Sequence, residues 1–325
     1  MRVIGIDVSK EKLDCLWLRD VDQGKVKTKV FKNTPQDHQQ LIAWTLKQTG
    51  EPIESIHFVM EATGVYHEAL AYTLHGAGAC VSVINPAQVR DYAKGIAVKT
   101  KTDKKDSMVL ARLGNAEPLV RWEPEPAEIR ELKALLSRYE ALQKDVRREL
   151  NRREKAQVSR VSDEVLRSID TVVEQLKEEA RRLEELIDQH IDQNPQLKHD
   201  RALLESIKAV GPVVSQYMIA VIRSRRFSSA KQCAAYLGTN PVQHESGSSI
   251  RGRSRLSKAG NGLIRAKLYM AAVTAIRYNP DVKALYERLV KRGKSKMAAL
   301  GAAMRKLVHI CFGVLKHQTP YQPQC

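Results

Sequence analysis

The chain has 325 residues, enough for two or three compact units, and 43% of them are hydrophobic, which excludes a disordered chain. Lys and Arg number 54 against 37 for Asp and Glu, a net charge of +17, so a polyanion is the first partner to consider. Solvated surface lysines would give the same total. Five scattered cysteines without a Cys-x-x-Cys pair argue against a zinc ribbon or a disulfide framework and fit a reducing compartment.

The chain begins with a short apolar run that ends at Asp7, without the long apolar segment of a secretory leader. No run approaches the roughly 18 apolar residues that are needed to span a bilayer. We therefore expect a soluble cytoplasmic protein that has no membrane partner.

Apolar runs, polar turns and helical periodicity alternate through the first part of the chain. Strands are predicted at residues 3–7, 12–19, 26–31, 53–60 and 79–84, and helices at 35–47 and 66–75. An initial hairpin followed by strands that alternate with helices predicts an α/β domain with a mixed sheet. Residues 86–106 predict a basic loop that leads into a helix over 107–113.

Prolines at 118, 124 and 126 predict a boundary between a first domain, residues 1–124, and a helical middle, residues 125–197. In this middle region apolar residues step by four and three over about three heptads: Ile169, Val173, Leu176, Ala180, Leu183 and Ile187. An antiparallel helical hairpin, an intermolecular coiled coil and a helix packed on its own domain all fit this pattern. The last unit, residues 198–325, is predicted to be mostly α. Residues 203–219 predict a helix, a turn at Val210-Gly211-Pro212 and a second helix, and further helices are predicted at 227–237, 263–277, 281–290 and 296–315.

Four acidic residues are candidates for a metal site. Asp7 and Glu61 end predicted strands, where ligands gather in open α/β sheets, and Asp103 and Asp106 lie three apart at a helix start. Converging carboxylates repel one another, and Mg²⁺ or Mn²⁺ removes that cost; two ions about 3.5–4 Å apart could clamp a phosphodiester. Singly, each acid could be a cap or a surface charge. The neighbouring lysines could contact phosphates or form ion pairs: Lys99, Lys101, Lys104 and Lys105.

A second candidate site is the stretch from Glu245 to Lys258, which is dense in Ser, Gly and Arg. Small residues let the backbone approach a ligand, and hydroxyls and amides suit phosphate oxygens. A disordered basic loop would have the same composition, which also does not choose a nucleophile among five serines. The candidate nucleic-acid contacts in it are Arg251, Arg253, Arg255 and Lys258.

Residues 204–218 are similar to a helix-hairpin-helix, which directs backbone amides at a helix N-terminus toward phosphates. Lys208-Ala209 stands where such motifs usually have Pro-Gly, and a plain helical turn is the alternative.

Several motifs, taken together and in order, resemble the DEDD transposases of insertion sequences. They are Gly5-Ile6-Asp7-Val8-Ser9-Lys10, Glu61-Ala62-Thr63-Gly64, Val83-Ile84-Asn85-Pro86, Lys101-Thr102-Asp103 with Asp106, Glu245-Ser246-Gly247-Ser248-Ser249 and Ser257-Lys258-Ala259-Gly260. The family consists of the bridge-RNA-guided serine recombinases of insertion-sequence family one-ten, which are relatives of Piv-type DNA invertases. The resemblance covers essentially the whole chain.

The resemblance implies an α/β RuvC-like (ribonuclease-H-like) N-terminal domain, a helical coiled-coil middle and a mostly α C-terminal transposase domain. It implies that an acidic tetrad, Asp7, Glu61, Asp103 and Asp106, holds Mg²⁺ and that Ser246 is the nucleophile. Family members act as tetramers built from dimers, in which the acids of one subunit face the serine of another. A structured non-coding guide RNA pairs with both donor and target double-stranded DNA. The implied function is RNA-guided recombination through a phosphoserine intermediate, at the nucleoid in the cytoplasm.

Three other functions remain compatible with the residues. A RuvC-like nuclease or Holliday-junction resolvase would use water as the nucleophile and Ser246 only to bind phosphate. A non-catalytic scaffold would bind nucleic acid and never cut it. A sugar kinase starts with a similar Gly-Ile-Asp strand, but this chain lacks further Gly-rich phosphate loops after its later strands.

Overall fold

A computed structural model of the protein describes residues 1–20, 23–62, 64–97, 102–242, 245–246, 250–251, 255–257 and 260–323, without the side chains of Lys104, Glu245, Ser246, Ile250 and Arg251. The chain forms two compact units, Met1–Pro124 and Glu125–Cys325.

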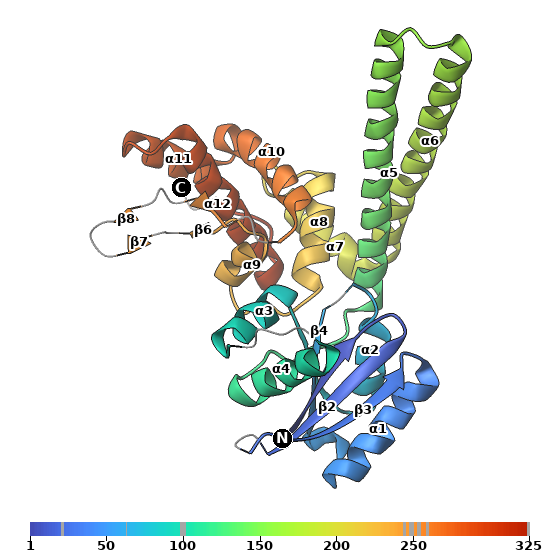
Figure 1. Ribbon diagram of the computed structural model, residues 1–325. Coiled ribbons are helices and arrows are strands. Elements are labelled where there is room, and N and C mark those ends of the chain that lie inside the picture. The colour runs from blue at the N-terminus through green and yellow to red at the C-terminus, as the bar shows by residue number, and fades with distance from the viewer. Residues whose placement is uncertain are drawn as a thin grey trace. The chain divides into compact units, whose positions relative to one another are not determined.

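The N-terminal unit is built on a five-stranded mixed sheet with the order β3-β2-β1-β4-β5 (Figure 1). A meander of β1 (Arg2–Val8), β2 (Lys12–Asp20) and β3 (Lys25–Lys32) forms the antiparallel half. The strands β4 (Ile56–Glu61) and β5 (Cys80–Ile84) continue the sheet in parallel with β1, because helical crossovers precede them. The predicted mixed α/β sheet is confirmed, with β1 between its two halves.

Side chains alternate between the two faces of β1, as the period of a strand requires. Ile4, Ile6 and Val8 lie in a core with α1 (Pro35–Thr49) and α2 (Glu68–Gly76). The opposite face packs against α4 (Asp103–Ala116), with Val3 in a second core beside Val109, Leu110 and Leu113. A short 3-10 turn, Ile53–Ser55, precedes β4 where the sequence predicted strand.

Residues 86–95, which were expected in a basic loop, form the helix α3 (Pro86–Gly95). The Asn85 side chain accepts a hydrogen bond of 2.8 Å from the Ala87 amide, and Pro86 occupies the first helical position. The expectation was wrong because a helix that buries a narrow stripe needs few large apolar residues, and here Val89 is the one buried. The following helix, α4 (Asp103–Ala116), also begins four residues earlier than predicted.

The C-terminal unit starts with two long helices, α5 (Ala127–Val158) and α6 (Asp163–Gln193), that form an antiparallel hairpin (Figure 1). The predicted heptad pattern faces α5 of the same chain: Ala180 and Leu183 are buried together with Leu142. Of the three alternatives that periodicity left open, the structure therefore contains the helical hairpin.

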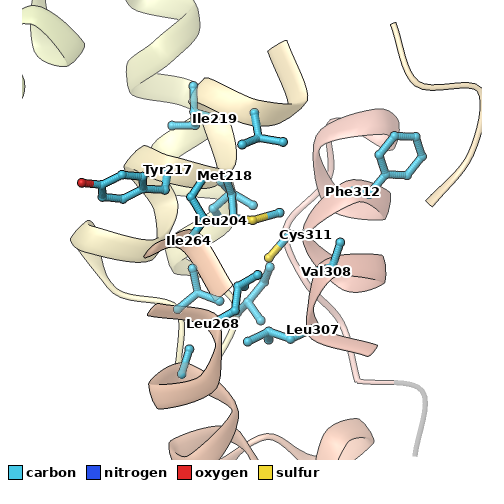
Figure 2. Packing of buried hydrophobic residues seen from close by; sticks show 14 of the residues in the cluster. Leu204, Tyr217, Met218, Ile219, Ile264, Leu268, Leu307, Val308, Cys311 and Phe312 are labelled. Carbon is cyan, nitrogen blue, oxygen red and sulfur yellow. The ribbon is translucent and has the colours of Figure 1, made fainter. Parts of the chain in front are cut away.

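Six further helices complete this unit: α7 (Pro195–Glu205), α8 (Pro212–Arg223), α9 (Ala230–Tyr236), α10 (Gly262–Tyr278), α11 (Pro280–Lys291) and α12 (Lys296–His317). Side chains of α7, α8, α10 and α12 meet in one apolar core, drawn in Figure 2. Ile129, Ile187 and Leu197 belong to the same core, so the boundary expected at residue 197 lies inside it.

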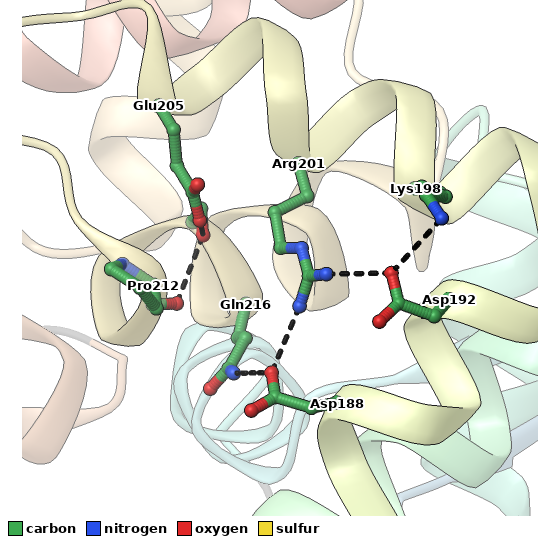
Figure 3. A network of polar contacts seen from close by, with 8 residues as sticks. Asp188, Asp192, Lys198, Arg201, Glu205, Pro212 and Gln216 are labelled. Atoms are coloured by element: carbon green, nitrogen blue, oxygen red, sulfur yellow. Dashed lines mark hydrogen bonds and ion pairs between the residues drawn. The ribbon is translucent and has the colours of Figure 1, made fainter.

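The base of the helical hairpin is tied to this core by a polar network (Figure 3). Arg201 of α7 donates to Asp188 at 2.8 Å and to Asp192 at 2.7 Å, both on α6. Gln216 of α8 donates to the same Asp188 at 3.3 Å. Three helices therefore share one set of contacts at the point where the hairpin leaves the core.

Among the described residues, α12 is the one helix with the length and apolar composition of a membrane span. In its most apolar window 61% is buried inside the unit. Burial among α9, α10 and α11 accounts for this composition, because the central helix of a core is apolar on most sides.

Candidate functional site

Three carboxylates meet at one edge of the N-terminal sheet because of strand register. Ile6 of β1 pairs with Met60 of β4, so Asp7 and Glu61 follow matched residues at the carboxyl ends of two parallel strands. On its other side Asp7 stands directly opposite Asp14 of β2. Side chains opposite each other in a ladder point to the same face, so Asp7 and Asp14 share the face that α4 covers.

Two glycines let α4 lie directly on this face. A Cβ on Gly5 would come 2.0 Å from the Ser107 carbonyl oxygen and 2.5 Å from the Ala111 nitrogen. A Cβ on Gly114 would come 2.7 Å from the side chains of Val3 and Val59. This close approach places the first turn of α4, which carries Asp103 and Asp106, beside the strand ends.

The carboxylates act on one another at short range. One oxygen each of Asp7, Asp14 and Asp103 lies within 4.8 Å of the others. Burial raises the pKa of Asp7 to about 6 from its ordinary 3.8, and the negative charges of Asp106, Asp103, Asp14 and Glu61 contribute to the rise. Of the four predicted acids, the structure thus brings Asp7 and Asp103 together and adds Asp14, while Glu61 and Asp106 act on Asp7 through their charges.

This donor set fits a hard divalent cation. All the groups are carboxylates, whose oxygens are the ligands that Mg²⁺ and Mn²⁺ prefer. Burial and the neighbouring carboxylates both disfavour a negative charge on Asp7, and a bound cation would offset both effects.

Lys12 brings a positive charge into this cluster. Its Nζ lies 2.5 Å from Oδ2 of Asp103 and 3.1 Å from Oδ2 of Asp14. These hydrogen bonds raise the pKa of Lys12 above its ordinary value. Sequence reasoning missed both Lys12 and Asp14. The available signal was Asp14 itself, an acid within the otherwise apolar run from Leu13 to Leu18.

Within the Ser-rich stretch, the described residues pair in two short β ladders. At its base β6 (Pro241–Val242) pairs with β9 (Arg255–Leu256), and the Ser257 amide donates to the Asn240 carbonyl at 2.9 Å. Further out β7 (Glu245–Ser246) pairs with β8 (Ile250–Arg251). Composition did not indicate these strands, because it does not reveal cross-strand pairing.

Close contacts anchor the base of this ladder in the C-terminal unit. Gly260 has φ +72°, and a Cβ there would lie 2.1 Å from the Tyr236 carbonyl oxygen at the end of α9. The Leu256 side chain packs against α12 at Gly301, where a Cβ would lie 3.6 Å away. The pair of β6 and β9 is therefore held against α9 and α12 of the C-terminal unit.

Several predicted residues lie outside the described part of the chain: Lys99, Lys101, Arg253, Lys258 and the side chains of Lys104, Arg251 and Ser246. Lys105 and Arg255 are described, and both are exposed. Their contacts with nucleic acid stay predictions.

The predicted helix–turn–helix consists of α7, a tight turn and α8. Ala209 in this turn has φ +80°, a left-handed conformation that glycine adopts more easily than any other residue. The Ser206 side chain accepts a hydrogen bond of 2.8 Å from the Tyr321 amide, so the C-terminal tail holds the turn in place. The turn is confirmed, and phosphate binding by it stays a prediction.

A basic turn between α11 and α12 was also missed. Lys291, Arg292, Lys294 and Lys296 lie within six residues and all are exposed. Within the described residues no carboxylate pairs with any of them. Such a cluster without acids is typical of a surface that contacts phosphates.

Comparison with known proteins gives concordant results over the whole chain. A family model described as a DEDD transposase of the IS110 type matches residues 4–158, and a model for the transposase IS116/IS110/IS902 family matches residues 201–287. The pilin gene-inverting protein of Moraxella bovis is 30% identical over 324 residues, covering 98% of this chain and 97% of the relative. An insertion element IS110 protein of Streptomyces coelicolor is 25% identical over 49% of this chain and 38% of its own length. RuvC of Thermus thermophilus aligns with 38% of this chain and 100% of its own at 16% identity, with a TM-score of 0.27.

Proposed function

Because this chain belongs to the IS110 family of DEDD transposases, we propose that it is the recombinase of an insertion sequence and cuts and joins DNA strands with the help of Mg²⁺ or Mn²⁺. The observation that carries the proposal is the cluster of Asp7, Asp14 and Asp103, together with the charges of Glu61 and Asp106 that act on Asp7. A scaffold that only binds nucleic acid has no use for such a cluster, which lowers its affinity for polyanions.

Asp7, Glu61, Asp103 and Asp106 are the proposed metal ligands, with Asp14 beside them. When bound there, the ion would polarise the scissile phosphoryl group and stabilise the charge that develops on its oxygens. The half-buried position of Asp7 and its place on a central strand give this group a rigid support.

Ser246 is the proposed nucleophile. Its Oγ attacks the phosphorus, the bond from phosphorus to the 3′ oxygen breaks, and the departing strand takes up a proton as a 3′ hydroxyl. The serine proton passes to water. A 3′ hydroxyl of the exchanged strand then attacks the phosphoserine ester, which restores the phosphodiester and the free serine. One ester bond replaces another at each step, so no ATP is required.

The proposal assigns the acids and the serine to different subunits of a homo-oligomer, a tetramer built from dimers. It also includes a structured non-coding guide RNA that pairs with donor and target DNA, while the protein contacts backbones and shape. The net charge of +17 supports a nucleic-acid partner of large size. Reconstitution with and without RNA transcribed from the flanks of the gene tests this part, since strand exchange at specific sites should require it.

The nucleophile is tested by trapping a covalent intermediate. Protein, RNA and labelled DNA are incubated with Mg²⁺, denatured and examined for DNA that stays attached to protein. We expect Ser246→Ala to lose this adduct. The matched controls are alanine variants of the other serines in the stretch, which should retain it: Ser248, Ser249, Ser254 and Ser257.

Each result has a distinct meaning. If Ser246→Ala gives as much adduct as the wild type, Ser246 is not the nucleophile. Cleavage by the wild type without any adduct favours the alternative, a RuvC-like nuclease or Holliday-junction resolvase that uses water. Cleavage retained by Asp7→Asn contradicts the metal role of the acids.

A further inference from the structure

We propose that Lys12 is the resident counter-cation of the acidic site: its ammonium group occupies the place of a divalent ion between Asp14 and Asp103, and it has to leave Asp103 when that ion binds. The inference rests on the metal site proposed above and adds the residue that controls its loading.

Rigid backbone aims Lys12 at the site. Lys12 begins β2 two residues before Asp14, so both side chains lie on the face that also carries Asp7. The turn before it is closed by two hydrogen bonds, from the Ser9 amide to the Lys12 carbonyl at 3.0 Å and from the Lys12 amide to Ser9 Oγ at 3.1 Å. The ammonium group therefore reaches the carboxylates from a fixed base.

The Lys12 ammonium and a divalent ion compete for the same oxygen. Nζ of Lys12 lies 2.5 Å from Oδ2 of Asp103, and an ion bound to that oxygen would stand at about 2.0–2.6 Å from it. Two cations on one carboxylate oxygen repel strongly at this separation. Asp103 is exposed, on the first turn of α4, so its carboxylate can exchange one cation for the other without unfolding the sheet.

Lys10 provides a matched control. It lies in the same β1–β2 turn, two residues from Lys12, and is exposed. Within the described part of the chain it has no carboxylate partner. Replacing Lys10 removes the same charge from the same turn and leaves the ion pair of Lys12 in place, which separates competition from a general change of net charge.

The test is a titration of the full-length protein with Mn²⁺ in the absence of DNA, followed by calorimetry or by the electron paramagnetic resonance of free Mn²⁺. We expect Lys12→Met to bind Mn²⁺ on the order of 3- to 30-fold more tightly than wild type, since one ion pair no longer competes. Lys10→Met should stay within about twofold of wild type. Lys12→Arg keeps the charge and should not tighten binding.

Mn²⁺ binding by Lys12→Met that is unchanged, weaker, or tightened only as much as in Lys10→Met overturns the inference. A parallel titration of Asp7→Asn distinguishes a failure of the proposed metal site from a failure of the role proposed for Lys12. If wild type and Asp7→Asn bind Mn²⁺ equally, or neither binds it, the proposed metal site falls and the role of Lys12 falls with it. An unfolding temperature above the titration temperature for each variant would show that all variants are folded during the measurement.

Discussion

At the scale of single residues, the Asp7 carboxylate lowers the stability of the folded protein when no divalent ion is bound. Its pKa is raised from 3.8 to about 6, so between these values the folded protein holds a proton that the unfolded chain releases. The free energy of unfolding therefore falls as the pH rises through this window and stays lowered above about pH 6. The full shift corresponds to about 3 kcal/mol, and partial exposure reduces it.

Asp7→Asn should remove this penalty. At pH 7.5 without divalent ions we expect the variant to be more stable than wild type by about 1–2 kcal/mol, with the difference vanishing near pH 4. Denaturant unfolding at both pH values measures the effect, and added Mn²⁺ should stabilise wild type more than the variant. Equal destabilisation of Asp7→Asn at both pH values would show that its carboxylate is needed for packing.

Ala209 carries backbone strain in the turn between α7 and α8. Its φ of +80° is unfavourable for a residue with a Cβ and unstrained for glycine. We expect Ala209→Gly to raise the free energy of unfolding by about 0.5–1 kcal/mol, measured by denaturant titration. Ala202→Gly, inside α7, is the control and should lower it by about 1 kcal/mol. A decrease of similar size in both variants would argue against strain at Ala209.

At the scale of elements, the contact between α4 and β1 depends on Gly5. A methyl group there overlaps the α4 backbone, so Gly5→Ala forces the helix away from the strand. We expect unfolding free energy to fall by about 2–4 kcal/mol and Mn²⁺ binding to weaken, because Asp103 and Asp106 move with the helix.

Gly76 at the end of α2 is the matched control for this prediction. A Cβ there meets nothing within 4 Å, so Gly76→Ala should change unfolding free energy by less than about 0.5 kcal/mol and leave Mn²⁺ binding intact. If Gly5→Ala binds Mn²⁺ as well as Gly76→Ala does, the position of the acids does not depend on this close approach.

At the scale of the whole molecule, the far end of the α5–α6 hairpin leaves apolar side chains exposed. They are Leu150 at 43%, Val158 at 80%, Val165 at 45% and Val172 at 39% exposure. Their place at the end of a helical hairpin suits pairing with the hairpin of a second copy. We expect Val165→Ser with Val172→Ser to raise the dissociation constant of the oligomer about tenfold or more, as measured by light scattering across a dilution series.

Val120→Ser is the control for this prediction, since Val120 is 83% exposed in the other unit. It should leave the molar mass unchanged. The double variant and Val120→Ser should both unfold at the temperature of the wild type, because exposed valines contribute little to stability. An unchanged mass for the double variant would assign assembly to another surface.

The basic turn between α11 and α12 predicts a measurable salt dependence. Replacing Lys291, Lys294 and Lys296 by Gln should weaken DNA binding and reduce the slope of log affinity against log salt by about 0.9 for each phosphate that is no longer neutralised. The matched triple is Lys94, Lys133 and Lys177, each already paired with a carboxylate, whose replacement by Gln should leave the slope near the wild-type value. Equal slopes in the two triples would remove this turn from the interface.

The strands of the N-terminal unit were predictable because their signals are local. Apolar runs in β1, β4 and β5 are typical of buried strands, and Asp7 and Glu61 stand where those runs stop. The heptads of α6 were likewise visible. Helix α3 and the Ser246 ladder were missed because a narrow buried stripe and cross-strand pairing leave little trace in composition.

Local patterns in the chain were enough to specify the strands of the N-terminal sheet, the long helices and the acids that stand at strand ends, since each depends on residues a few positions apart. Long-range packing alone established that Asp14 and Lys12 join the acids, that α4 lies against Gly5, and that the heptads of α6 pack on α5. These contacts join residues far apart in the chain. The position of Asp14 and Lys12 depends on strand register, and the position of α4 depends on the absence of a Cβ at Gly5. The packing of α6 depends on which apolar helix surface lies beside it.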